Sequence, residues 1–431
     1  MKVKPKKINI ITLGCAKNTV DSEVLDAQLK GNNILVTQNV KDADAVVINT
    51  CGFIEASKKQ SIDTILNAIK LKEKNKLEKV FVMGCMVERY KKELQKEIPE
   101  VDEYFGTNNL PQILKSLGGE FKKELLGERI VSTPKFYSYL KISEGCDNPC
   151  SFCAIPLMRG KHKSKPIEIL MNEVVSLVKN GTKELNIIAQ DTTYYGLDLY
   201  GKRKLASLLK SLSTLEELKW IRLMYAYPAK FPLDILPVIA EKNNICKYLD
   251  MPIQHVSDEV LKSMRRGISR RTTEELIIKI KKEIPGIALR TTLIVGYPNE
   301  TEKDLNILAD FVEENEFDRL GVFTYSQEDD TTAFPLNDPI STEEKEARKN
   351  YIMEIQQKVS LKKNKARIGK IFEAVVEENK NGNYIGRTSI DAPEIDNSIK
   401  IISDNKLNIG DFVKVKITEA KEYDLIGKQI K

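Results

Sequence analysis

Three cysteines on one short segment have the spacing of a metal-binding loop. Cys146, Cys150 and Cys153 lie in the run EGCDNPCSFC, a C-x3-C-x2-C pattern that directly follows the strand-like run YLKIS. Three thiolates on one loop can bind one face of a 4Fe-4S cluster and leave the fourth iron open to another ligand. A structural zinc site is the alternative, but such sites close with four protein ligands, and nearby only His162 offers itself as the fourth. We therefore predict a 4Fe-4S cluster at this loop.

A second set of three cysteines is spread over the first hundred residues. Cys15, Cys51 and Cys85 each end a strand-like run, in INIITLGC, AVVINTC and VFVMGC, and each precedes a helical pattern. In a parallel sheet the carboxyl ends of the strands meet at one edge, where open α/β sheets bind ligands, so the three thiols are predicted to converge. The helix N-termini that follow them would favour the thiolates that bind metals. Three buried cysteines that only fill core space are the alternative.

The pattern of strands and helices divides the chain into parts that position these cysteines. Residues 1–120 alternate strand-like runs with helical stripes, which predicts an α/β domain with a parallel sheet. Residues 121–136 are polar and lack a sustained period, so they are predicted to be a linker. Residues 137–362 contain six strand-like runs separated by helical patterns, typical of a partial (βα) barrel, and place Cys146 at the face where such barrels do their chemistry. Short strands over residues 363–431 predict a small all-β barrel.

Composition excludes several classes of protein. The chain has 431 residues, of which 41% are hydrophobic and 30% charged, as in soluble globular proteins. Its 68 Lys and Arg against 62 Asp and Glu leave a net charge of +6, too small by itself to indicate a nucleic-acid-binding protein. No apolar run approaches the roughly 20 residues that span a bilayer, so we predict no membrane partner. Seven cysteines, an odd number, favour reduced thiols in a cytoplasmic protein, and the isolated Cys246 is predicted to be a core residue.

The cysteine loop points to a known family and to the residues that bind its cofactor. The run CDNPCSFC resembles the cluster loop of the radical S-adenosylmethionine (SAM) enzymes, in which an aromatic residue precedes the last cysteine, as Phe152 does here. The resemblance implies that SAM binds the open iron and that Phe152 contacts its adenine, although a loop aromatic packed into ordinary core is the alternative. Gln190 and Asp191 follow the second barrel strand and are predicted to bind SAM, with a helix cap as the alternative for Asp191. His255, after the fourth strand, either faces the cavity or is an oriented structural histidine.

Two three-cysteine sites followed by a small β-barrel resemble the methylthiotransferases, radical-SAM enzymes that insert a methylthio group into an unactivated C–H bond. The resemblance covers nearly the whole chain, from Lys7 to the tail. It implies a second 4Fe-4S cluster in the N-terminal domain, a radical-SAM barrel in the middle, and a TRAM domain that recognises substrate at the end. It also implies that one SAM methylates a sulfur held at the N-terminal cluster, while another is cleaved at the barrel cluster and yields the radical that abstracts a substrate hydrogen.

Within this family the chain is similar to the branch that modifies the β-carbon of a loop aspartate of small-subunit ribosomal protein twelve. The tRNA branch tends to have a Gly-Cys-Gln-Met-Asn-like run where this chain has Ala16, Lys17 and Asn18 after the first cysteine, and Arg where it has Glu55. The tail, residues 362–431, has 14 Lys and Arg against 11 Asp and Glu, which favours a protein substrate over RNA. The runs that carry the similarity are LGCAKNTVDSE, NTCGFIEASKKQSIDTIL, AQDTTYYGLDLYG, YLDMPIQHVSDEVLKSMRRG and FDRLGVFTYSQEDDTTA.

The resemblance also implies partners. The substrate would be ribosomal protein twelve, free or in the ribosomal subunit, and the electron donor a protein such as flavodoxin or ferredoxin. Because this substrate is expected to be basic, the acidic loop Glu328, Asp329 and Asp330 is predicted to help dock it, with a solvated loop as the alternative. Methylthiolation of a tRNA adenosine is the alternative function. A more remote alternative is an RNA-binding protein whose cysteines hold structural zinc.

Overall fold

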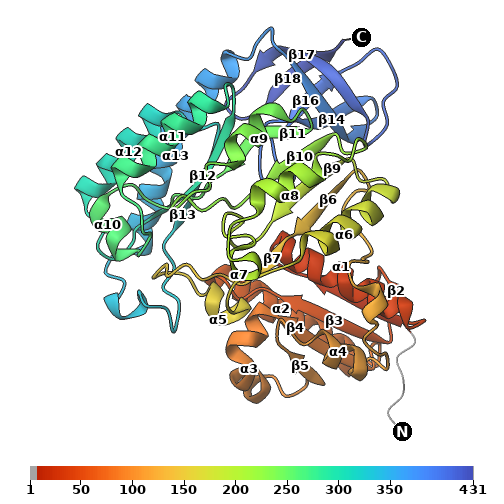
Figure 1. The fold of residues 1–431 in the computed structure, drawn as a ribbon. Helices are drawn as coiled ribbons and strands as arrows, with labels where there is room; N and C mark the ends of the chain where they lie inside the picture. The colour runs from red at the N-terminus through yellow and green to blue at the C-terminus, as the bar shows by residue number, and fades with distance from the viewer. Residues whose placement is uncertain (1–6, 431) are drawn as a thin grey trace.

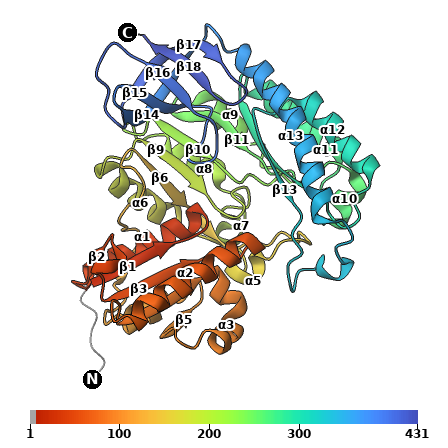
Figure 2. The same cartoon turned by 180° about the vertical axis from the view of Figure 1, so that it is seen from behind.

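The computed structural model describes residues 7–430, which form three consecutive units (Figure 1). Residues 1–6 and 431, at the outer ends of the predicted first and last domains, lie outside the described residues. The N-terminal unit, in red and orange, lies at one end of the molecule, and the C-terminal β-barrel, in blue, lies at the other (Figures 1 and 2). The central unit lies between them, so the predicted fold class and its order along the chain are confirmed.

The N-terminal unit is built on a five-stranded parallel sheet with the order β2-β1-β3-β4-β5. The sequence predicts its three central strands but not its two edge strands, which have only three residues each and so show no clear period. The strands are β1 (Lys7–Thr12), β2 (Leu35–Thr37), β3 (Ala45–Thr50), β4 (Lys79–Gly84) and β5 (Glu103–Phe105).

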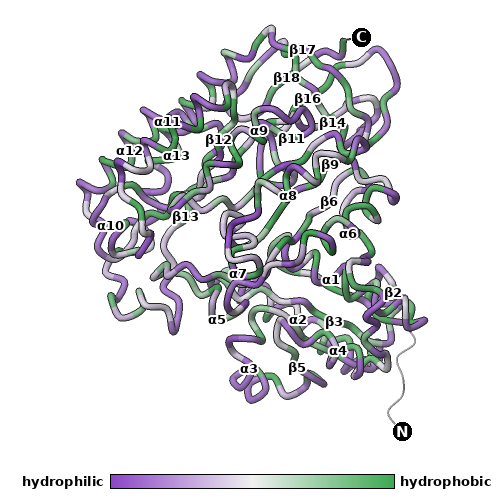
Figure 3. The backbone as a smooth tube through the Cα atoms, viewed as in Figure 1, coloured by the Kyte–Doolittle hydropathy of each residue, from purple (hydrophilic) through white to green (hydrophobic). Residues whose placement is uncertain are grey.

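Helices cover both faces of this sheet because its central strands are apolar on both sides. All six residues of β3 are buried, and the tube in Figure 3 shows β3 and β4 as largely hydrophobic segments. Val47 packs with Leu25 and Leu29 on one face, whereas Ile48 packs with Ile65 on the other. The helices are α1 (Ala16–Gly31), α2 (Glu55–Glu73), α3 (Cys85–Glu97) and α4 (Leu110–Ser116).

The central unit is a parallel sheet of six strands in the order β13-β12-β11-β10-β9-β6, which curves without closing. All six strands correspond to predicted runs, so the partial barrel is confirmed. They are β6 (Tyr137–Lys141), β9 (Glu184–Ile188), β10 (Trp220–Leu223), β11 (Ile245–Asp250), β12 (Ala288–Val295) and β13 (Arg319–Thr324). The helices around the sheet are α6 (Ile167–Lys179), α8 (Leu205–Leu212), α9 (Ile235–Glu241), α10 (Asp258–Ser263), α11 (Arg270–Glu283), α12 (Glu302–Asn315) and α13 (Thr342–Lys365). Within residues 7–430, no helix combines the length and the hydropathy needed to cross a membrane.

The two faces of this sheet differ in chemistry. Alternate residues of a strand point to opposite faces. In β9 the residues Leu185 and Ile187 pack against the outer helices. The alternate residues Glu184 and Asn186 face the concave side together with Arg222 of β10. These three polar side chains are fully buried, because α1 and the C-terminal barrel cover the concave side. The interior of the partial barrel therefore holds buried polar side chains beside the aromatic residues Tyr137 and Trp220.

The C-terminal unit is a closed five-stranded barrel in the order β14-β15-β16-β18-β17. Four of its strands correspond to predicted runs, and the four-residue β16 was not predicted because it is short and lies in a polar stretch. The barrel has its own apolar core, which includes Val376, Ile399 and Val415. The strands are β14 (Ile371–Lys380), β15 (Asn383–Thr388), β16 (Ile399–Ile402), β17 (Phe412–Ala420) and β18 (Leu425–Gln429).

Buried ion pairs join the C-terminal barrel to the central sheet. The Glu184 carboxylate lies 3.2 Å from Nε of Arg222 and 2.6 Å from Nη2 of Arg387, which belongs to β15. Burial alone would raise the pKa of Glu184, but the two guanidinium groups hold it below its usual range. Arg319 of β13 is likewise paired with Asp391 of the loop that follows β15. The position of the barrel therefore depends on ion pairs between residues that are far apart in the sequence.

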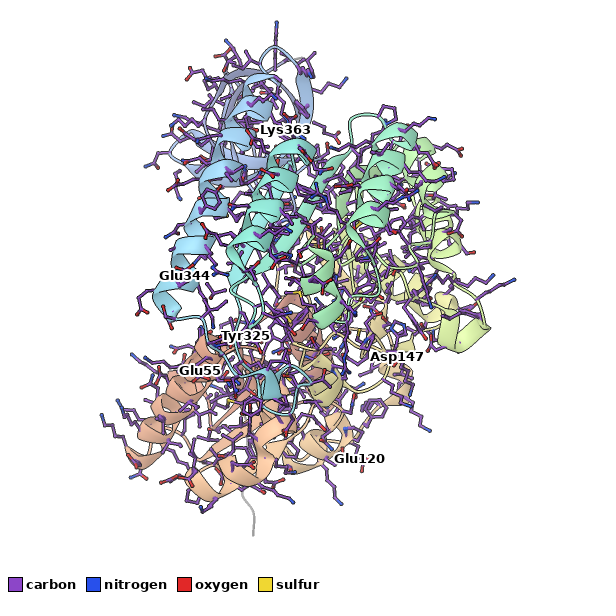
Figure 4. The ribbon with its side chains drawn as sticks, turned by 90° about the vertical axis from the view of Figure 1, so that its left-hand side faces the viewer. Glu55, Glu120, Asp147, Tyr325, Glu344 and Lys363 are labelled. Atoms are coloured by element: carbon purple, nitrogen blue, oxygen red, sulfur yellow. The ribbon has the colours of Figure 1, made fainter. Side chains whose placement is uncertain are left out.

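A residue of the predicted linker joins the N-terminal unit to the central unit. Arg129 is buried and lies 2.9 Å from the carboxylate of Glu23 on α1 and 3.2 Å from that of Glu173 on α6. Figure 4 shows the junction of the two units, with Glu55 labelled at the start of α2 and Tyr325 labelled after β13. The polar linker is therefore an ordered part of the interface.

Replacement of Arg387 by methionine is expected to weaken the attachment of the C-terminal barrel. Glu184 would stay buried with one of its two guanidinium partners gone, and breaking a buried ion pair costs about 3 kcal/mol. Calorimetry should show a lower Tm for R387M than for the unmodified protein. Lys380→Met, at an exposed position of the neighbouring strand β14, is the matched control and should leave the Tm unchanged. An R387M protein that melts like the control would show that this pair does not hold the barrel.

Candidate active site

The three cysteines of the N-terminal unit lie together at the carboxyl edge of its sheet, as the strand pattern predicts. Cys15 follows β1, Cys51 follows β3 and Cys85 follows β4, and these strands are neighbours in the sheet. At Gly14, which has a φ of +90°, a Cβ atom would lie 2.8 Å from Cβ of Cys51. At Gly84, with a φ of +103°, it would lie 2.7 Å from a backbone carbonyl oxygen. Glycine before two of the cysteines therefore permits the close approach of the strand ends.

Burial makes the thiols of this set weakly acidic. It raises the pKa of Cys51, and it raises the pKa of Cys85 to about 12, with neighbouring thiolates of the set acting in the same direction. At Cys51 the backbone N–H of Phe53, just before α2, lowers the pKa in the predicted direction, but burial outweighs it. Buried thiolates are stable only beside positive charge, so the donor set fits an iron-sulfur cluster, whose iron supplies that charge. Within residues 7–430, no group of His, Cys, Asp and Glu side chains is arranged to hold a single metal ion.

The other three cysteines lie on a loop that a short hairpin closes. The strands β7 (Ser143–Glu144) and β8 (Lys163–Ser164) pair at its base, and the Cys153 amide donates to the Cys150 carbonyl at 3.2 Å. Burial raises the pKa of Cys146 to about 11 and that of Cys153 to about 12, and the neighbouring Cys150 thiolate adds to both shifts. This set also fits a cluster, since its three sulfurs share one loop and need a compensating charge.

Two polar side chains that the sequence did not single out contact Cys150. Nη1 of Arg266 donates to the Cys150 sulfur at 3.2 Å, and the Tyr227 hydroxyl lies 3.6 Å from the same sulfur. The Arg266 guanidinium also stacks 4.3 Å from the centroid of the Tyr227 ring. A guanidinium at this distance can donate to the sulfur of a cluster ligand and orient it. The sequence signal for this contact was the pair of arginines in the run SMRRG, which has no obvious connection to the cysteine loop.

Arg159 connects the two sets of cysteines. It ends the short helix α5 (Ile155–Arg159), which follows Cys153, and its Nε donates to the sulfur of Cys85 at 3.2 Å. Its Nη1 donates to Asp21 of α1 at 2.6 Å. Met158, the residue before it, packs directly against Cys85. Arg159 therefore joins the two sets across the contact between α3 and α5, and the sequence did not predict this residue's role.

The predicted SAM-binding pair lies beside the cysteine loop. The Asp191 carboxylate is buried, accepts from Asn148 of that loop at 2.8 Å, and accepts from the Thr193 amide at 2.8 Å. The second bond closes a local turn. Asp191 therefore accepts from nearby backbone, as in the alternative of a helix cap, but it does so at a turn and not at the start of a helix. Gln190 donates to Glu144 at 3.1 Å, and its Oε1 is buried without a hydrogen-bond partner among the described residues. A role of either residue in SAM binding stays a prediction.

The structure places the two other predicted residues in packed surroundings. Phe152 packs against the aromatic pair Tyr297 and Tyr325, which agrees with the alternative of a loop aromatic in ordinary core. His255 is fully buried, its Nδ1 accepts from the Ser257 amide at 3.0 Å, and burial lowers its pKa to about 4. It is therefore neutral at pH 7 and oriented by backbone, as a structural histidine is. Contact of Phe152 with adenine stays a prediction.

The acidic loop after β13 is used inside the molecule. Glu328 is 3% exposed, accepts from Arg89 at 2.9 Å, and has the Lys58 ammonium 3.4 Å from its carboxylate. Asp329 accepts from the Tyr90 hydroxyl at 3.3 Å. The predicted role in docking a basic substrate is therefore wrong for Glu328, which joins the central unit to α2 and α3. The prediction failed because a run of acidic residues does not indicate which of them have internal partners.

Comparison with known proteins assigns the chain to a family. Residues 7–106 match the Uncharacterized protein family UPF0004, residues 140–312 match the Radical SAM superfamily, and residues 368–430 match the TRAM domain. The chain is 55% identical over 434 residues to the ribosomal protein uS12 methylthiotransferase RimO of Chloroherpeton thalassium, with 100% of both chains covered. It is 53% identical over 428 residues to the protein of the same name from Cytophaga hutchinsonii, covering 99% of this chain and 98% of that one. The chain belongs to the RimO methylthiotransferase family.

Membership of the RimO family confirms several predictions. The chain is a radical-SAM methylthiotransferase, and its C-terminal barrel is a TRAM domain. The radical-SAM match implies a 4Fe-4S cluster and SAM. The branch named for ribosomal protein, predicted over the tRNA branch, is the branch to which the similar proteins belong. The residues that could hold these groups are the thiols, two of which accept a hydrogen bond from an arginine.

Solved structures share this fold at low sequence identity. The radical SAM methyltransferase TsrM from Kitasatospora setae has a TM-score of 0.58 at 14% identity, covering 76% of this chain and 77% of that one. The cobalamin-dependent SAM radical enzyme OxsB has a TM-score of 0.52 at 13% identity, covering 81% of this chain and 56% of that one. These likenesses concern the fold alone.

Replacement of Glu328 by glutamine is expected to loosen the junction of the two cysteine-bearing units. Arg89, whose side chain is 3% exposed, would lose its charge partner, and an unpaired buried charge costs about 3 kcal/mol. Thermal unfolding should give a lower Tm for E328Q than for the unmodified protein. Asp330→Asn, two residues away and exposed, removes one charge from the same loop and is the matched control. Equal Tm values for the two variants would contradict the role of Glu328 at the junction.

Proposed function

We propose that this chain inserts a methylthio group at the β-carbon of a loop aspartate of ribosomal protein uS12, using SAM and two 4Fe-4S clusters. The full-length identity of 55% to a protein named as a uS12 methylthiotransferase supports the substrate. The two sets of three thiols support the two clusters. The proposed ligands are Cys146, Cys150 and Cys153 for the radical-SAM cluster and Cys15, Cys51 and Cys85 for the N-terminal cluster.

The contact between the two sets of thiols carries this proposal. Arg159 follows Cys153 closely in the chain and yet donates to the sulfur of Cys85, so a substrate at this contact would be near both sets. A reaction that generates a radical at one centre and takes sulfur from another requires this proximity, because the reacting atoms must be held in one orientation. Two structural zinc sites, in contrast, could function far apart from each other.

The residues around the thiols have roles that follow from their contacts. When bound, the clusters and SAM supply the electron, the radical and the methylthio group. Arg159 and Arg266 each donate an N–H to a sulfur, which stabilises negative charge there and orients the ligand. Burial of Cys85 limits the access of water to its sulfur.

We further propose that SAM lies beside the cysteine loop, near Phe152, Gln190 and Asp191. The bond from Asn148 to Asp191 supports this position, since it joins the loop to the end of β9. The unpartnered Oε1 of Gln190 supports it as well, because buried oxygens normally have a donor.

The remaining proposals concern the organisation and surroundings of the protein. We propose domains at residues 1–120, 137–362 and 363–431 with a linker at 121–136, and the matched ranges 7–106, 140–312 and 368–430 fall within these limits. The TRAM domain would contact the substrate. An electron donor such as flavodoxin or ferredoxin and a cytoplasmic location fit the reduced cysteines of the radical-SAM chemistry.

Deletion of the gene tests the proposed substrate. Mass spectrometry of the source organism with and without the gene should show loss of a methylthio group from the aspartate-containing loop peptide of uS12. Hydrolysed tRNA nucleosides from the same cells are the control and should keep their methylthio adenosine. Loss from tRNA alone would make the chain a tRNA enzyme, and loss from neither would contradict methylthiolation altogether.

Arg159→Met tests the proposed N-terminal cluster. Loss of a hydrogen bond to a ligand commonly lowers metal affinity about 10- to 100-fold, so purified R159M should retain fewer iron and sulfide ions per chain. The iron that remains should be the radical-SAM cluster, so cleavage of SAM to 5′-deoxyadenosine should persist while methylthiolated product decreases. Lys161→Met, at an exposed position two residues later, is the control. Full iron content and full product in R159M would contradict the role of Arg159 at this cluster.

A further inference from the structure

Lys17 is a buried lysine without an ion-pair partner. Its exposure is 7%, and its ammonium nitrogen lies 3.1 Å from the centroid of the Tyr225 ring. Among residues 7–430, no carboxylate oxygen lies within 4.0 Å of this nitrogen. An ammonium has three hydrogen-bond donors, and a ring face satisfies none of them fully. The ammonium therefore has hydrogen-bond donors left for a ligand.

The contact of Lys17 with Tyr225 joins the two units that carry the thiols, since Lys17 belongs to α1 and Tyr225 follows β10. Lys17 comes two residues after Cys15, at the start of α1. Tyr225 comes two residues before Tyr227, whose hydroxyl lies 3.6 Å from the sulfur of Cys150. The ammonium therefore lies where a segment that carries Cys15 meets a segment that carries Tyr227, the neighbour of Cys150.

The backbone holds Tyr225 in a strained conformation at this place. Its φ is +57°, a value that residues other than glycine rarely adopt. The Tyr225 amide donates to Asp250 at 2.9 Å, and the Thr192 amide donates to the Tyr225 carbonyl at 3.1 Å. Strained residues fixed by several bonds are concentrated at binding sites, because the surrounding structure maintains them for a purpose.

Two other cations near the thiols have carboxylate partners, whereas Arg266 donates to the Cys150 sulfur and to the Pro252 carbonyl. Lys141 and Arg159 are both paired with Asp21 and Glu144. Asp21 lies one helical turn after Lys17, but its carboxylate is occupied by these two cations. Among residues 7–430, Lys17 makes no hydrogen bond or ion pair through its ammonium, so its donors are available to an incoming anion.

We propose that Lys17 binds the side-chain carboxylate of the substrate aspartate and so positions its β-carbon between the two centres. This inference rests on the proposed function, which makes the substrate an aspartate. The β-carbon is bonded directly to the carboxyl carbon, so a fixed carboxylate leaves the β-carbon little freedom to move. Tyr225 would support the ammonium from the opposite side. An adenine base has no carboxylate, so this contact would favour an aspartate without adding affinity for the base of a tRNA substrate.

A binding experiment on the cluster-loaded enzyme tests this role without relying on turnover. The affinity for purified uS12 is compared with that for uS12 in which the loop aspartate is changed to asparagine. The unmodified enzyme should bind the aspartate form about 10- to 100-fold more tightly, as expected for a charge-assisted hydrogen bond. Lys17→Met should remove this preference by weakening the aspartate form alone. Lys30→Met, at the exposed end of the same helix, should keep it.

SAM also carries a carboxylate, so its affinity is measured for the same variants. The proposal expects K17M to bind SAM as the unmodified enzyme does. Weaker SAM binding with an unchanged preference for aspartate would overturn the proposal and assign Lys17 to the cofactor. Equal losses for the two forms of uS12 would also overturn it, because they would indicate a packing role. If K17M fails to retain its clusters, Lys17→Gln provides the same comparison.

The experiment separates this inference from the proposed function. An unmodified enzyme that modifies uS12 but does not prefer aspartate to asparagine in binding would overturn the role of Lys17 alone. An enzyme that neither binds nor modifies uS12 would overturn the proposed function and the role of Lys17 with it.

Discussion

The hydrogen bond from Arg159 to the sulfur of Cys85 determines how the two halves of the active site meet. Arg159 belongs to the central unit and Cys85 to the N-terminal unit, so one N–H···S contact fixes the separation of the two sets of thiols. Asp21 holds the same guanidinium from α1, and Met158 fills the space beside it. Because the reaction proposed here needs two centres close to one carbon atom, every other interface of the molecule must be compatible with this contact.

Burial gives these thiols their dependence on positive charge. It raises the pKa values of Cys85 and Cys153 to about 12, far from neutral pH, and neighbouring thiolates add to the effect. Two guanidinium groups partly compensate, one from Arg159 and one from Arg266, and bound iron would complete the compensation. Lys17, by contrast, has no carboxylate partner among residues 7–430, and the carboxylate of the substrate aspartate is proposed to supply one.

The three units are joined mainly by buried charges. Glu328 joins the central loop to α2 and α3, Arg129 joins the linker to both neighbouring units, and Glu184 joins the central sheet to the TRAM barrel. Such pairs contribute modestly to stability but strongly disfavour other arrangements, since a misplaced domain would leave a charge buried alone. The arrangement suits an enzyme in which a substrate must reach both sets of thiols while the concave side of the sheet stays closed.

The sequence by itself determined the order of the domains, the strands that carry the cysteines, and the convergence of Cys15, Cys51 and Cys85, because strand and helix patterns are local and parallel strands end at one edge. It missed the two edge strands of the N-terminal sheet and the short barrel strand β16, whose three or four residues show no period. Only the tertiary structure revealed the contact of Arg159 with Cys85 and the internal use of Glu328, since the partners are far apart in the chain. The acidity of the thiols was also decided by tertiary structure, because burial depends on every unit packed around them and outweighs the helix N-termini.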